Sequence, residues 1–229
     1  MDFTEFEKKI GLDFTDKSLL QQAFVHRSYI NENKQSGFSH NERLEFLGDA
    51  VLELVITDFL YKKYPDKTEG DLTAYRSALV NADTCASIAT SIKIGDFLLL
   101  SKGESKDVGR ARQYILANAL EALIGAIYLD QGMEKAKDFI ERDFTPRIDD
   151  IISGRSFIDA KSLFQEKAQE FDGITPSYKT VKESGPDHEK RFTVGVYVGK
   201  ELVAIGEGES KQDAEQAAAR QALSTRGWN

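Results

Sequence analysis

The sequence predicts an all-α domain followed by a small α+β domain with the element order α-β-β-β-α. Three observations favour this fold class. Residues up to about 150 carry apolar side chains at helical spacing, a later part alternates apolar and polar residues in three stretches, and a short polar connection separates the two. We therefore expect one domain at residues 1–152 and a second at residues 157–227.

The first domain is predicted to consist of successive helices. Thr15 or Asp16 is a suitable N-cap for an early helix, and Pro65 ends the longest one because proline cannot continue a helix. Gly132 closes a later apolar helix. The predicted helical segments lie at about 16–24, 41–64, 68–86, 114–129 and 136–140.

The second domain begins with an amphipathic helix at residues 160–171. Alternating stretches at 177–183, 191–198 and 202–207 are typical of half-buried strands. An alanine-rich helix at 210–224 follows them. This order predicts an antiparallel sheet with both helices packed on one of its faces.

Composition excludes two broad classes of protein. The single cysteine, Cys85, excludes a disulfide framework and suits a reducing compartment. The charged start of the chain lacks the apolar core of a signal peptide, and no apolar run approaches the roughly 18 residues of a membrane span. We expect a cytoplasmic protein with no membrane partner. The net charge of −8 disfavours a uniformly basic surface, although a local basic groove is compatible with it.

Acidic residues form the most informative pattern of the chain. Glu42, Glu45 and Asp49 follow at i, i+3 and i+7, which places three carboxylates in one stripe along the helix predicted at 41–64. Such a stripe is usually a solvated helix face. Because the rest of this helix is largely apolar, we expect the stripe to face the protein interior. There, desolvation and mutual repulsion cost several kcal/mol unless a cation neutralises the charge.

A second apolar helix carries its own isolated polar pair, Asn118 and Glu121. If the two helices meet, this pair completes an all-oxygen cage with Glu45 and Asp49, and such a cage favours Mg²⁺ or Mn²⁺ over zinc. A di-iron bundle is the other option for inward-facing acids. It requires Glu-x-x-His motifs, which the three histidines do not supply.

The segment from Glu42 to Leu52 resembles the signature of the ribonuclease III family. The resemblance extends to Thr68–Leu72, to Ser101–Glu104 and to the helix from Ala117 to Asp130, and with the second domain it covers nearly the whole chain. It implies a homodimeric, Mg²⁺-dependent endonuclease of double-stranded RNA, in which Mn²⁺ can substitute. Ribosomal RNA precursors and messenger RNA are the expected substrates, cut to 5′-phosphate products with 3′ overhangs.

By this resemblance, one group of oxygen-bearing residues holds the metal: Glu45, Asp49, Asn118 and Glu121. A second, overlapping group of acids takes part in catalysis: Asp49, Glu121, Glu42 and Glu69. Phe46 matches an aromatic residue of the family's dimer contact, and a core position fits its sequence context equally well.

Asn118 stands where the family usually has an aspartate. An amide keeps a carbonyl oxygen for coordination but lacks the negative charge, so we predict weaker Mg²⁺ binding than an aspartate would give. The alternative function is therefore a catalytically weakened protein that still binds double-stranded RNA.

Residues from about 159 to 226 resemble a double-stranded RNA-binding domain, which reads A-form RNA by its shape. The resemblance implies that Gln165 and His188 reach the minor groove and that Lys211, at the start of the last helix, meets phosphate. The segment 157–229 holds ten Lys or Arg against twelve Asp or Glu. We therefore expect few phosphate contacts and weak binding by this domain alone.

Overall fold

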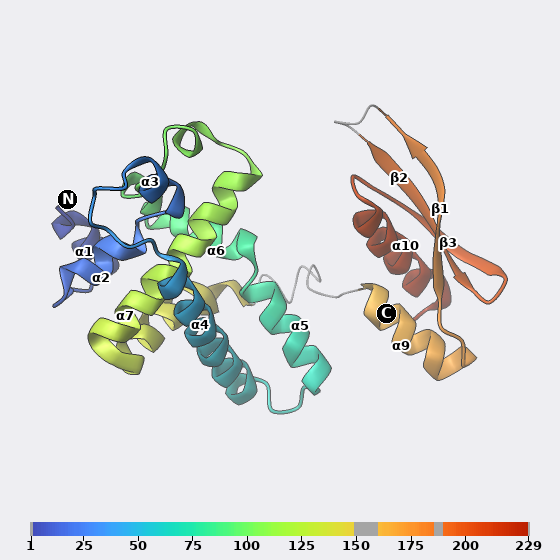
Figure 1. Ribbon diagram of the computed structural model, residues 1–229. Helices are drawn as coiled ribbons and strands as arrows, with labels where there is room; N and C mark the ends of the chain where they lie inside the picture. The colour runs from blue at the N-terminus through green and yellow to red at the C-terminus, as the bar shows by residue number, and fades with distance from the viewer. Residues whose placement is uncertain (1, 149–159, 186–189, 229) are drawn as a thin grey trace. The chain divides into compact units, whose positions relative to one another are not determined.

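The computed structural model describes residues 2–148, 160–185 and 190–228, which belong to two compact units, 1–157 and 158–229 (Figure 1). The predicted domain boundaries at 152 and 157 lie outside the described residues. The first unit is helical and the second combines three strands with two helices, which confirms the predicted fold class.

The first unit is built from α-helices and short 3₁₀ helices (Figure 1). The α-helices are α1 (Thr4–Ile10), α2 (Lys17–Ala23), α3 (Arg27–Glu32), α4 (Glu42–Lys63), α5 (Glu69–Leu79), α6 (Ala82–Ser91) and α7 (Arg110–Phe144). The 3₁₀ helices are η1 (Ile94–Asp96), η2 (Glu104–Lys106) and η3 (Thr145–Arg147).

Two of the predicted helix boundaries need comment. The prediction of a single helix at 68–86 is wrong, because this segment is divided into α5 and α6. The side chain of Asn81 accepts a hydrogen bond from the Thr84 N–H and so caps a new helix. The break expected at Gly132 is confirmed, since this residue has a φ of 83° inside α7, a left-handed value that glycine adopts without strain.

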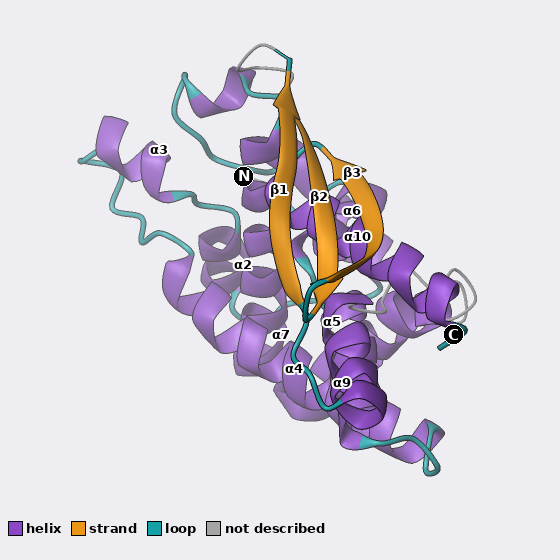
Figure 2. Ribbon diagram, turned by 90° about the vertical axis from the view of Figure 1, so that its right-hand side faces the viewer, coloured by secondary structure: helices purple, strands orange, loops and turns teal. Residues whose placement is uncertain are grey.

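Helices α4 and α7 pack side by side through the middle of the first unit (Figures 1 and 2). The start of α4 is anchored by Asn41, which is buried and donates from its side-chain amide to the Ala23 carbonyl at 3.2 Å. Its backbone N–H donates to the Val25 carbonyl at 2.9 Å. These bonds bring the segment between α2 and α3 to the first turn of α4.

Although α4 is largely apolar, it is not buried around its whole circumference. One face packs into the core, while Phe46, Leu54 and Tyr61 are 81%, 58% and 71% exposed. These three residues are spaced by eight and seven positions and therefore lie along one face of the helix. Phe46 is not a core residue of this chain.

The second unit contains α9 (Ala160–Asp172), β1 (Ser177–Ser184), β2 (Arg191–Val198), β3 (Glu201–Gly208) and α10 (Lys211–Arg226). The strands form one antiparallel sheet in the order β1-β2-β3, with β2 in the middle (Figure 2). Both helices cover the same face of this sheet (Figure 1), as expected. Buried Phe164 and Ala218 pack there against Val196.

None of the helices in the described part of the chain is both long enough and apolar enough to cross a membrane.

Candidate functional site

The backbones of α4 and α7 touch where two glycines face each other. A Cβ atom added to Gly48 would lie 1.7 Å from the carbonyl oxygen of Glu121, and one added to Gly125 would lie 2.3 Å from that of Leu44. No side chain fits in either place. Glycine thus lets the helices approach closely, and this approach brings the acids beside Gly48 next to Glu121.

The side chains of Glu45, Asp49, Asn118 and Glu121 meet at this crossing. Burial, together with the like charges of Asp49 and Glu45, raises the pKa of Glu121 from 4.5 to about 7. Burial also raises the pKa of Glu45, with Glu42 and Asp49 adding to the effect and a hydrogen bond with Asn118 opposing it. The structure therefore brings together the four residues that the sequence predicted as neighbours.

The interior position expected for these acids is only partly correct. Asp49 is exposed, and Glu45 and Glu121 are half-buried, so the site opens to solvent on one side. Helix α6 packs against α7 and carries the buried Cys85 near these acids. Burial raises the pKa of the Cys85 thiol there to about 12, and Glu121 and Asp49 add to this shift.

The charge of this site fits a bound cation. Within the described residues, no lysine or arginine pairs with Glu45, Asp49 or Glu121. Oxygen donors of this kind suit Mg²⁺ or Mn²⁺. Across all the described residues, His, Cys, Asp and Glu side chains by themselves form no group of three or more that is arranged to hold a metal ion. Asn118 belongs to a different residue type, and its side-chain carbonyl adds a further oxygen atom beside the three carboxylates.

Glu42 lies at the edge of this group and has an arginine and a histidine as neighbours. Its carboxylate is 3.3 Å from Nη1 of Arg27 and 3.6 Å from Nδ1 of His40. Burial lowers the pKa of the nearby His26, while Glu104 and Glu42 oppose this shift. The Asn41 anchor places these basic residues beside the first turn of α4.

Glu69 does not join the other acids within one chain. It is exposed in the first turn of α5 and accepts a hydrogen bond from the Thr73 hydroxyl at 3.1 Å. It lines a cavity of about 420 Å³ whose walls include Thr57 and Tyr61 near the far end of α4. At 1.5 Å per residue, these residues lie roughly 20 Å along the helix from Glu45.

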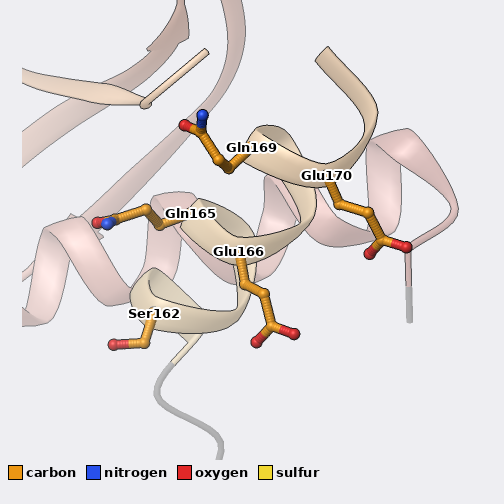
Figure 3. Close-up of a pocket in the computed structure, with 5 residues that line it drawn as sticks. All are labelled: Ser162, Gln165, Glu166, Gln169 and Glu170. Carbon is orange, nitrogen blue, oxygen red and sulfur yellow. The ribbon is translucent and has the colours of Figure 1, made fainter. Parts of the chain in front are cut away.

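The second unit presents polar side chains on α9. Figure 3 shows Gln165 and Gln169 pointing to one side of this helix and Glu166 and Glu170 to the other. Gln165 also lines a shallow cavity of about 550 Å³ together with Lys211, so the structure brings these two predicted residues together. His188, the third predicted RNA-binding residue, lies outside the described residues.

Comparison with known proteins identifies both units. A model of the Ribonuclease-III-like family matches residues 16–148, and one of the double-stranded RNA binding motif matches residues 160–225. The protein Ribonuclease 3 of Borreliella burgdorferi is 47% identical over 220 residues, which are 96% of this chain and 89% of that protein.

The chain belongs to the ribonuclease III family. It is an endoribonuclease of double-stranded RNA. Ribonuclease 3 of Enterococcus faecalis is 44% identical over 96% of this chain and 95% of its own length. A solved nuclease domain of ribonuclease III from Campylobacter jejuni is 42% identical and has a TM-score of 0.56; it covers 63% of this chain and 99% of its own.

Sequence reasoning missed two features of this ribonuclease III. Gly48 and Gly125 were not recognised as the contact that sets the site, although a glycine inside a helix costs about 1 kcal/mol relative to alanine and so indicates a reason for its presence. The pairing of Arg27 and His40 with Glu42 was also missed. No spacing pattern indicates it, because it depends on how residues 25 and 41 are hydrogen-bonded.

Proposed function

We propose that this ribonuclease III is a divalent-metal-dependent enzyme that uses Mg²⁺, with Mn²⁺ as a substitute. The proposed ligands are the residues at the helix crossing: Glu45, Asp49, Asn118 and Glu121. The pKa of Glu121, raised to about 7 by burial, Asp49 and Glu45, is the observation that carries the proposal. It reflects a carboxyl group that is partly desolvated and lies beside two like charges, and a bound cation offsets both effects. When bound, such an ion activates water, neutralises phosphoryl charge and supports the leaving oxygen.

The proposed catalytic residues are Asp49, Glu121, Glu42 and Glu69. Asp49 is the exposed member of the crossing and is therefore the carboxylate nearest to an approaching RNA backbone. Glu121 is oriented by the helix contact at Gly48. Glu42 is held at the edge of the site by Arg27, whose charge also suits a neighbouring phosphate.

The proposed role of Glu69 requires a homodimer, because this residue shares a cavity with Thr57 and Tyr61, which lie roughly 20 Å along α4 from Glu45. The exposed face of α4, made of Phe46, Leu54 and Tyr61, supports such a dimer, since exposed apolar side chains gathered on one face are typical of protein contacts. The solved Campylobacter jejuni structure is described as showing flexibility in a region involved in dimer formation of that nuclease domain.

Light scattering tests the proposed dimer. We expect the mass of two chains for the native protein and of one chain for Phe46→Glu. Val108→Glu is the matched control, because Val108 is 95% exposed outside α4. A native chain that stays monomeric at micromolar concentration contradicts the dimer and, with it, the role of Glu69.

For the second unit we propose that Gln165 and His188 contact the minor groove and that Lys211 contacts phosphate. The shared cavity of Gln165 and Lys211 supports a single binding surface formed by α9 and the start of α10. Duplex RNA recognised by shape requires such a surface rather than a deep pocket.

Cleavage of long duplex RNA tests the catalytic proposal. We expect cleavage with Mg²⁺ and with Mn²⁺, none with a chelator, and products that carry 5′-phosphates and 3′ overhangs. We further propose ribosomal RNA precursors and messenger RNA as substrates in the cytoplasm. Cleavage that persists after chelation would reject the metal dependence.

Asn118 favours a second candidate, an enzyme of low cleavage rate whose main effect is to bind double-stranded RNA. The hydrogen bond between Asn118 and Glu45 supports it, because this bond engages both side chains without a metal ion. The same cleavage assay separates the two. Tight RNA binding with no product under either ion favours the binding function.

A further inference from the structure

The proposed RNA-binding surface contains an internal ion pair at its most exposed basic residue. Nζ of Lys211 lies 3.0 Å from Oε1 of Glu183, and the two side chains are 58% and 39% exposed. Lys211 also lies over the ring of Phe192, at 5.6 Å from its centroid. One lysine at the start of α10 therefore contacts residues of both β1 and β2.

The backbone fixes this arrangement. Glu183 on β1 pairs with Phe192 on β2 in the sheet register, so their side chains leave the same face of the sheet. The end of β3 presses against the first turn of α10, because a Cβ atom added to Gly208 would lie 2.4 Å from the backbone nitrogen of Ala214. The start of α10 is thus held over the strand ends that carry Glu183 and Phe192. The ion pair is a consequence of this packing rather than a chance meeting of two long side chains.

A similar pair lies on the same surface. Nζ of Lys161 is 2.5 Å from Oε2 of Glu215, and both residues line the cavity that Gln165 and Lys211 share. Two lysines on the proposed RNA-binding surface thus each have a carboxylate within ion-pairing distance. A phosphate that approaches Lys211 meets the charge of Glu183 as well as that of the lysine.

We propose that Glu183 is an internal counter-ion that RNA phosphate must displace from Lys211, so that Glu183 limits the affinity of this ribonuclease III for double-stranded RNA. The inference rests on the proposed contact between Lys211 and phosphate. In this proposal Glu183 weakens RNA binding, whereas the residues that contact RNA strengthen it. Displacement costs one exposed ion pair, so the effect is moderate in size.

The test measures binding of the full chain to a labelled RNA duplex of about 20 base pairs, longer than the ~16 such a domain spans. A chelator prevents cleavage. We expect Glu183→Gln to lower Kd by about two- to fivefold, the range that corresponds to an exposed ion pair. We also expect the dependence of binding on salt to become steeper by up to about one unit, because Lys211 then gains a phosphate without releasing a carboxylate.

A double-mutant cycle separates displacement from a general effect of charge. Lys211→Gln is expected to raise Kd, and Glu183→Gln is expected to change Kd little when Lys211 is already Gln. The matched control is Glu201→Gln, which removes the same charge from an ion pair with Arg226 at the other end of α10. Its effect on Kd is expected to be small, because that end lies roughly 22 Å along the helix from Lys211.

Two results would overturn the inference while the Lys211 contact stands. One is an unchanged Kd for Glu183→Gln although Lys211→Gln weakens binding. The other is an equal decrease in Kd for Glu183→Gln whether residue 211 is Lys or Gln, which indicates a long-range electrostatic effect of the Glu183 charge. An unchanged Kd for Lys211→Gln rejects the phosphate contact itself, and the counter-ion role with it.

Discussion

The two units handle charge in opposite ways. At the crossing of α4 and α7, Glu45, Asp49 and Glu121 are held together without a lysine or arginine partner among the described residues. On the surface of α9 and α10, Lys161 and Lys211 each pair with a carboxylate of the same unit. The first arrangement holds like charges close together, and in the second each of the two lysines has its own carboxylate.

This difference shows that the first site depends on the backbone contact between α4 and α7. Like charges remain close only if the elements that carry them cannot move apart. Gly48 and Gly125 supply that constraint, whereas in the second unit packing brings Lys211 beside Glu183 and the opposite charges then attract each other.

The largest expected effect comes from breaking the helix contact. Gly48→Ala adds a Cβ atom that would lie 1.7 Å from the backbone of Glu121, so the helices must separate. We expect a loss of about 3 kcal/mol or more in the free energy of unfolding. Thermal or urea unfolding measures it. Gly70→Ala in α5, where the nearest atom is 3.8 Å away, is the control and should change stability little. Equal stability of both variants would show that the crossing is not tight.

The next effect is the pH dependence of stability without metal. The pKa of Glu121 is raised from 4.5 to about 7, so the folded chain holds a proton that the unfolded chain has released. Stability therefore falls as pH rises through this window, by about 1–3 kcal/mol. Urea unfolding at pH 5 and pH 8 with a chelator measures the fall.

Two variants sharpen this prediction. Glu121→Gln should remove most of the fall between pH 5 and pH 8, because no proton is then exchanged at this position. Glu53→Gln, an exposed change on the same α4, should keep it. Mg²⁺ should stabilise the native chain more at pH 8 than at pH 5. A native stability that does not change with pH would contradict the electrostatic view of the site.

A smaller effect is expected from Asn118→Asp. A fourth carboxylate adds negative charge to the proposed metal site, so the Mg²⁺ concentration for half-maximal cleavage should fall by about three- to tenfold. Cleavage rates over a Mg²⁺ titration measure this. Identical metal dependence of both proteins would remove Asn118 as the cause of weak metal binding.

The smallest effect concerns salt. Because Lys161, Lys167, Lys211 and Arg226 each pair with a carboxylate, we expect RNA binding by residues 157–229 to depend on salt as if about two or three phosphates were neutralised. Kd measured over a series of salt concentrations gives this slope. A slope near that of six or more contacts, or nanomolar binding at physiological salt, would contradict internal neutralisation.

Much of the fold was predictable because it depends on short-range patterns. Helical spacing located α4 to within one residue at each end, and alternation located β2 at its observed bounds, Arg191–Val198. The split between α5 and α6 was not predicted. The apolar spacing continues across it, and the cap of Asn81 decides it locally.

For the candidate site, the sequence predicted only which residues take part. The spacing of Glu42, Glu45 and Asp49, together with the isolated pair on the second helix, indicated which residues meet. It did not indicate how far they are buried, and Asp49 and Phe46 proved to be exposed. Period and spacing define the faces of a helix, but tertiary packing determines what each face contacts.

The sequence by itself determined the two-domain order, the helical and strand periods and the acids that share a helix face, because these follow from residues close in the chain. Only the tertiary structure decided that Gly48 meets the backbone of Glu121, that Glu69 stands apart, and that Lys211 faces Glu183. Such contacts join residues far apart in the chain, and they arise from the close packing of whole elements rather than from any local preference.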